Sequence, residues 1–139
     1  MYPNRFEDKG TQPTSGFADH TPIAVIILTF NEAPNLPQAL ASVKGWAQEI
    51  FVLDSFSTDN TVEIASQAGC TVFQNAFVDY AKQRNFAIEQ LPIKSEWILF
   101  LDADEWLLDE LKDEISRLLE TDPEENGFFC VSTSYRNEP

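Results

Sequence analysis

The chain is poor in several residue types on which common kinds of functional site depend. Its 139 residues include two cysteines, one histidine and five glycines. Two cysteines as far apart as Cys70 and Cys130 exclude a disulfide-rich scaffold and a cysteine-based zinc site. His20, the single histidine, lies in a polar leader, so catalysis by histidine is not expected either.

The shortage of glycine and of basic residues excludes further classes of site. No G-x-G-x-x-G follows the first apolar run and no G-x-x-x-x-G-K-[ST] occurs, so no glycine loop is expected to cradle phosphates. Nine basic residues against 23 acidic ones give a formal charge of −14. This charge argues against nucleic acid and anionic lipid as partners, because both bind basic surfaces. It is compatible with a protein that recruits divalent cations.

Long apolar runs are also missing. No stretch approaches the roughly 20 apolar residues of a membrane span. The first twenty residues are polar and contain no apolar core of a signal peptide. They predict a flexible arm over residues 1–21 and one globular domain over residues 22–139, with a cytoplasmic location.

Within that domain, predicted strands alternate with predicted helices. Apolar, β-rich runs predict strands over residues 23–28, 50–53, 71–73, 97–101 and 127–131. Apolar residues at helical spacing predict helices over residues 33–46, 60–68, 79–90 and 106–120. This alternation predicts an α/β fold, with a Rossmann-like, mainly parallel sheet and helices on both faces.

The most informative segment is W-I-L-F-L-D-A-D-E, residues 97–105. Its apolar run is typical of a strand buried on both faces in a parallel sheet, and ligands of such sheets bind outside the carboxyl ends of the strands. Residues i and i+2 of an extended chain point the same way, so Asp102 and Asp104 could reach one cation, and the small Ala103 leaves room for it. The alternative is that these acids only cap the following helix.

Polar clusters also follow the first two predicted strands. The first strand ends in T-F-N-E, residues 29–32, and the second in D-S-F-S-T-D, residues 54–59. Because the carboxyl ends of parallel strands open on one edge of the sheet, three acid-bearing exits there predict a site. A divalent cation held by carboxylates could bind phosphate oxygens at the same time.

The helix predicted over residues 79–90 carries an arginine in its apolar stripe. On a helical wheel Arg84 lies in the middle of that stripe, so we expect it to face the sheet. The apolar members of the stripe are Phe77, Tyr80, Ala81, Ile88 and Leu91. A buried arginine is costly without a partner, and helical side chains lean toward the N-terminus. Arg84 is therefore expected to reach the acidic exits or an anionic ligand beside them. The alternatives are a structural ion pair with Asp54 or a snorkelling side chain.

Four motifs in this order resemble family 2 glycosyltransferases of the GT-A fold: T-F-N-E, D-S-F-S-T-D-N-T, Q-R-N and L-D-A-D-E. The match runs from about Pro22 to the end of the chain, and D-S-F-S-T-D with Q-R-N looks most like the bacterial heptose glucosyltransferases of the lipopolysaccharide core. The resemblance implies transfer of a sugar, with inversion, from a nucleotide-sugar, expected to be a UDP-sugar, to a glycan or lipopolysaccharide-core acceptor. It also implies peripheral contact with the inner face of the bacterial inner membrane.

The resemblance further implies a donor site built from these motifs. Its nucleotide-binding residues would be Thr29, Asn31, Glu32, Asp54, Ser57, Arg84, Asp102 and Ala103. Asp54 would contact the base, and Arg84 the base or the diphosphate. Asp104, with Asp102, would bind Mg²⁺ or Mn²⁺ on the diphosphate. Family members normally continue past residue 139, so the catalytic base and the acceptor site are expected there, and no base is assigned.

Two other functions remain open at this point. One is a non-catalytic nucleotide-binding or interaction domain of the same fold. The other is a nucleotidyltransferase, which also uses metal-bound acids on an α/β sheet. A glycine- and lysine-bearing loop near the first strand would indicate the latter, and the sequence has none there.

Overall fold

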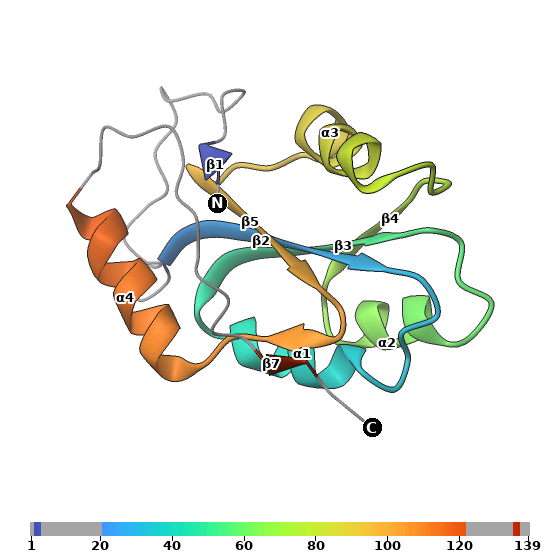
Figure 1. Ribbon diagram of the computed structural model, residues 1–139, viewed down its shortest axis with the longest axis horizontal. Coiled ribbons are helices and arrows are strands. Elements are labelled where there is room, and N and C mark those ends of the chain that lie inside the picture. The colour runs from blue at the N-terminus through green and yellow to red at the C-terminus, as the bar shows by residue number, and fades with distance from the viewer. Residues whose placement is uncertain (1, 4–20, 122–134, 137–139) are drawn as a thin grey trace.

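The structure is a computed structural model that describes residues 2–3, 21–121 and 135–136 (Figure 1). The strands are β1 (Tyr2–Pro3), β2 (Thr21–Thr29), β3 (Ala47–Asp54), β4 (Thr71–Gln74), β5 (Trp97–Asp102), β6 (Glu105–Trp106) and β7 (Tyr135–Arg136). The helices are α1 (Leu36–Val43), α2 (Thr61–Gln67), α3 (Tyr80–Gln90) and α4 (Asp109–Glu120). Among the described residues, no helix has both the length and the apolar content that spanning a membrane requires.

The main sheet has the strand order β1-β5-β2-β3-β4. Strands β5, β2, β3 and β4 are parallel, and β1 pairs antiparallel with β5. The predicted α/β fold with a mainly parallel, Rossmann-like sheet is therefore confirmed. The chain moves outward from β2 through β3 to β4 and then returns to the other side of β2 as β5. The direction in which the chain adds strands therefore reverses at the boundary between β2 and β5. Ligands of parallel sheets bind at such a switch point.

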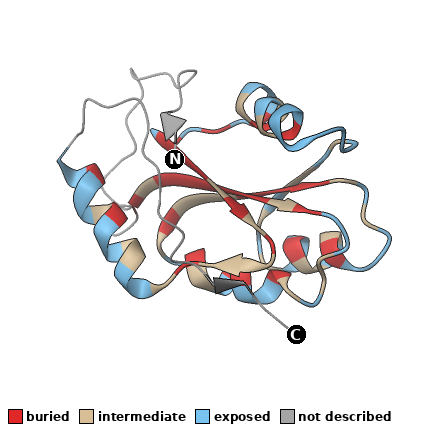
Figure 2. Cartoon of the chain, viewed as in Figure 1, coloured by how far each residue is buried: buried red, intermediate tan, exposed pale blue. Residues whose placement is uncertain are grey.

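Helices cover both faces of this sheet, as Figure 1 shows. On one face, Val25 and Ile27 of β2 belong to a core cluster with residues of α1, α2 and α4. On the other face, Ala24 and Ile26 pack in a second cluster with Ala87 of α3. Alternate residues of a strand point to opposite faces, so β2 is buried along almost its whole length (Figure 2). This rigid centre holds the strand ends that carry the polar motifs.

Three sequence-based expectations need correction. Helix α4 begins at Asp109 and not at residue 106, because Glu105–Trp106 pair with β7 as a small second sheet. The N-cap of α4 is Leu108, so the hypothesis that the acids of residues 102–105 cap this helix is wrong. Tyr2–Pro3, expected in a flexible arm, form an edge strand. The strand predicted over residues 127–131 lies outside the described residues.

Candidate functional site

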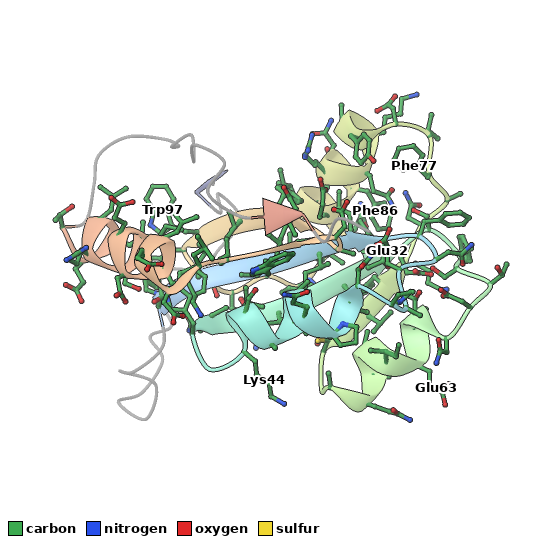
Figure 3. All side chains as sticks on the ribbon, turned by 60° about the horizontal axis from the view of Figure 1, so that its bottom comes forward. Glu32, Lys44, Glu63, Phe77, Phe86 and Trp97 are labelled. Carbon is green, nitrogen blue, oxygen red and sulfur yellow. The ribbon has the colours of Figure 1, made fainter. Side chains whose placement is uncertain are left out.

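A cavity of about 760 Å³ opens beside the carboxyl ends of β2 and β5, at the switch point of the sheet. The loops after β2, β3, β4 and β5 and the start of α3 form its walls. The lining residues are Leu28, Thr29, Phe30, Glu32, Ser55, Phe56, Ala76, Phe77, Tyr80, Gln83, Asp102, Ala103 and Asp104. In Figure 3, Glu32 and Phe77 lie at the same end of the sheet although they come from different loops. The cavity therefore unites segments far apart in the sequence.

The acidic part of the cavity consists of Glu32, Asp102 and Asp104, all partly exposed. None of the described residues that line the cavity is lysine, arginine or histidine. A ligand phosphate placed here would be repelled by three carboxylates unless a cation accompanied it.

The donor chemistry of this acidic part suits a divalent cation shared with a ligand. No group of three or more Asp, Glu, His or Cys residues within the described part of the chain is arranged to enclose a metal. Mg²⁺ commonly binds through one or two carboxylates and completes its shell with substrate phosphates and water. Asp102 and Asp104 fit that mode of binding. Glu105 has a different role, because its Oε1 accepts a 3.1 Å hydrogen bond from the backbone N–H of Asp102.

Four aromatic side chains line the same cavity. Phe30, Phe56, Phe77 and Tyr80 are 56%, 54%, 48% and 57% exposed. The rings of Phe77 and Tyr80 meet edge to face, with centroids 5.1 Å apart. Large apolar side chains gathered and exposed at one place mark binding surfaces. The site thus combines aromatic walls with carboxylates.

Asp54, expected to contact the ligand, is fully buried and does not line the cavity. Its Oδ1 accepts hydrogen bonds from the hydroxyls of Thr29 (2.7 Å) and Ser57 (2.5 Å). Its Oδ2 accepts from the backbone N–H of Ser57 (2.8 Å) and from Nε2 of Gln74 (3.3 Å). Burial raises the pKa of Asp54, but the hydrogen bonds from Ser57, Thr29 and Gln74 together outweigh it, so the net pKa lies below 3.8. Asp54 therefore links the ends of β2, β3 and β4 by hydrogen bonds.

Asn31 and Ser57 also connect loops and do not line the cavity. The backbone N–H of Asn31 donates to Oγ of Ser57 at 2.8 Å. The side-chain Oδ1 of Asn31 accepts from the backbone N–H groups of Thr58 (2.7 Å) and Asp59 (3.3 Å). Asn31 has a φ of 51°, a left-handed conformation that asparagine tolerates better than most residues. These bonds fix the loop after β2 against the loop after β3.

Asp59 and Thr61 extend this connection. Asp59 accepts hydrogen bonds from the hydroxyl and backbone N–H of Thr61 and, at 3.2 Å, from the backbone N–H of Ala33. The Thr61 hydroxyl in turn accepts from the backbone N–H of Glu32 at 2.9 Å. The hydrogen bond from the Thr61 side chain is the main reason why the pKa of Asp59 lies below its ordinary value. The backbone of Glu32 is thus held in place from the neighbouring loop.

The prediction that Arg84 lies in the middle of the buried face of α3 is wrong. That face consists of Gln83 and Ala87, while Arg84 is partly exposed. The guanidinium carbon of Arg84 lies 5.8 Å from the ring centres of both Tyr80 and Phe100. No ion pair joins Arg84 to Asp54 within the described residues. A neutral amide is less costly to bury than a guanidinium, which gains from stacking on aromatic rings instead.

Gln83 is the functional candidate that sequence reasoning missed. It is 1% exposed and lines the cavity. Its Nε2 donates to Oγ of Ser55 (3.1 Å) and to the backbone carbonyl of Asn75 (3.2 Å), and its Oε1 accepts from Nδ2 of Asn75 (2.9 Å). Gln83 therefore joins the loops after β3 and β4 to α3. The signal in the sequence was its place as the first residue of the Q-R-N motif.

Replacing Gln83 with leucine is expected to lower the free energy of unfolding by about 2 kcal/mol, because the partners of its amide become unsatisfied in a buried place. The matched control is Gln90→Leu, an exposed residue of the same helix, which is expected to change that free energy by less than about 0.5 kcal/mol. Urea denaturation followed by circular dichroism measures both. Equal stability of the two variants would contradict the assigned role of Gln83.

Comparisons of the sequence agree on one family. The profile described as "Glycosyl transferase family 2" matches residues 24–138. A Rickettsia felis protein described as an uncharacterized glycosyltransferase is 46% identical over 93 residues, which are 67% of this chain and 32% of that protein. The glycosyltransferase SunS of Bacillus subtilis is 37% identical over 126 residues, 87% of this chain and 29% of SunS. The chain thus spans about a third of the length of these relatives.

Solved structures agree on the fold. Residues 1–349 of TarS from S. aureus match with a TM-score of 0.59 and 24% identity, covering 71% of this chain and 32% of that one. The same part of TarS in complex with UDP matches with a TM-score of 0.54 and 25% identity, covering 70% and 32%. The mainly parallel sheet with helices on both faces is therefore a fold that this part of TarS shares.

Proposed function

Since this chain belongs to glycosyl transferase family 2, we propose that its cavity is the donor site of a metal-dependent, inverting glycosyltransferase. The donor is a nucleotide-sugar, with UDP as the nucleotide, and residues 22–139 form the donor-binding part. One observation carries this proposal: three carboxylates and four aromatic rings converge on a cavity whose described lining has no basic side chain. A UDP-sugar offers a planar base to the rings and a diphosphate that reaches the acids only with a cation.

The residues that line the cavity are assigned to direct contact with the donor. Thr29 and Glu32 lie at the end of β2 and would border the nucleoside. Asp102 would lie near the ribose, beside the small Ala103, and Asp104, together with Asp102, would hold Mg²⁺ or Mn²⁺. When bound, the metal would supply Lewis-acid stabilisation of the charge on the leaving diphosphate.

The remaining predicted residues are assigned to positioning. Asp54 has both carboxylate oxygens engaged by other side chains and backbone, so it would shape the nucleoside side of the site without touching the base. Asn31 and Ser57 would hold the loop that carries Glu32. Arg84 would brace Tyr80 of the aromatic wall. No residue of the described chain is assigned as the catalytic base.

The choice of UDP is supported by a neighbour, since the TarS structure that matches at 25% identity is a complex with UDP. The D-S-F-S-T-D and Q-R-N motifs support an acceptor of the lipopolysaccharide-core type and a location at the inner face of the bacterial inner membrane. A non-catalytic domain that only binds the nucleotide would share the donor site, and it would bind UDP-sugar without transferring the sugar.

Isothermal titration calorimetry with UDP tests the proposed donor site. The expected result is saturable binding at one site per chain in Mn²⁺ that disappears in EDTA, because the cavity needs a cation to accept the diphosphate. ADP serves as the control for the base and should bind more weakly. Equal affinity with and without metal, or no binding by a chain shown to be folded, would contradict the proposal.

A further inference from the structure

Phe56 has a backbone conformation that its side chain disfavours. Its φ is 61°, in the left-handed region, which is strained for a bulky residue. Among the described non-glycine residues, Asn31 is the other with positive φ, and asparagine tolerates that conformation. Phe56 is therefore the strained position of this site.

Hydrogen bonds on both sides hold Phe56 in this conformation. The backbone N–H of Ser55 donates to the carbonyl of Thr29 at 2.9 Å, and the backbone N–H of Ser57 donates to Oδ2 of Asp54 at 2.8 Å. The ring that results lines the cavity and is 54% exposed. Strained residues held in this way cluster at ligand-binding sites.

Phe56 and the acids lie at opposite sides of the cavity. Phe56 follows β3, whereas Asp102 and Asp104 follow or end β5, and β2 lies between these strands. Two inter-strand spacings amount to about 10 Å. A nucleoside diphosphate also has two different ends, a planar base at one and the charged diphosphate at the other. With the diphosphate beside the acids, the base reaches the side of the cavity where Phe56 lies.

We propose that Phe56 is the stacking platform for the base of the donor nucleotide. This inference rests on the proposed donor function and adds a base-binding residue to it. An aromatic ring accepts any planar base on its face, so Phe56 contributes affinity, while polar groups around it distinguish one base from another. The strained turn presents the ring to the ligand before binding.

Four variants test this proposal: Phe56→Ala, Phe56→Gly, Phe56→Trp and the control Val78→Ala. Val78 is an exposed apolar residue, 65% exposed, that does not line the cavity. Affinities for UDP and pyrophosphate in Mn²⁺ are measured by calorimetry, and that for uridine by ligand-observed NMR. Alanine and glycine should weaken UDP and uridine binding about tenfold, the usual effect of losing one stacked ring. Pyrophosphate binding should not change, and tryptophan and the control should stay near wild type.

Thermal melting supplies a second readout, which separates the effect of the strained backbone from the effect of losing the ring. Phe56→Gly should melt about 3 °C above Phe56→Ala, because glycine adopts positive φ without strain. The glycine variant would then be the more stable of the two and yet bind UDP as weakly. Unchanged UDP affinity in both variants, or an equal loss of pyrophosphate affinity, would overturn the role of Phe56 while wild-type UDP binding keeps the donor function. Failure of the wild-type chain to bind UDP would overturn both.

Discussion

Replacement of Asp104 by asparagine is expected to weaken Mn²⁺-dependent UDP binding by about 100-fold, at the upper end of losses seen around metal sites. Asp104 lines the cavity and is partly exposed, so its carboxylate is available to a cation. Asparagine keeps the shape of the side chain and removes the charge that a hard divalent cation prefers. Calorimetric titration of UDP at fixed Mn²⁺ measures the change in affinity.

The matched control is Asp113→Asn, which removes the same charge from the exposed surface of α4. It should bind UDP as the wild type does, and both variants should melt near the wild-type temperature. If the control loses as much affinity as Asp104→Asn, the effect comes from net charge alone. Retained affinity in a folded Asp104→Asn variant would remove Asp104 from the metal site.

Replacement of Asp54 by alanine is expected to lower the free energy of unfolding by about 3 kcal/mol or more, because several buried donors lose a charged acceptor. The donors are the hydroxyls of Thr29 and Ser57, the backbone N–H of Ser57 and the amide of Gln74. Thr29→Val removes only one of these bonds and should cost about 1 kcal/mol. Urea denaturation measures both variants. If Asp54→Ala lowers the free energy of unfolding no more than Thr29→Val does, Asp54 does not link the strand ends in the way proposed.

The stabilising effect of Asp54 should also depend on pH. The pKa of Asp54 lies below its ordinary value of 3.8 in the folded protein because its hydrogen bonds together outweigh the opposing effect of burial. The charged form therefore stabilises the fold fully above about pH 5, and this contribution is lost as the pH falls through the folded pKa. The difference in unfolding free energy between wild type and Asp54→Ala should narrow from pH 6 toward pH 2. A constant difference over this range would contradict the assignment.

The sheet could be predicted from sequence because its strands are short apolar runs with clear ends. Burial on both faces of β2 and β5 follows from their apolar runs over residues 23–28 and 97–101, and parallel order follows from the alternation with helices. The start of α4 could not be predicted in this way. It depends on pairing between Trp106 and Tyr135, a contact between residues far apart in the chain that no local pattern encodes.

The acidic part of the site could be predicted because parallel strands place their carboxyl ends on one edge of the sheet. The structure brings Thr29, Glu32, Asp102, Ala103 and Asp104 to one cavity, as the order of the motifs led us to expect. The aromatic wall was not predicted, because the apolar stripe around Arg84, which was expected to face the sheet, includes Phe77 and Tyr80. They lie instead on the cavity, because the helix docks through Gln83 and Ala87, and the angle of docking cannot be read from one helix alone.

The most direct test of the donor site is a crystal structure of the chain with UDP and Mn²⁺, with data collected at a wavelength where manganese scatters anomalously. We expect an anomalous peak beside the carboxylate of Asp104, diphosphate oxygens next to it, and the base against Phe56. A manganese peak away from Asp102 and Asp104, or UDP bound outside the cavity between the ends of β2 and β5, would contradict this expectation.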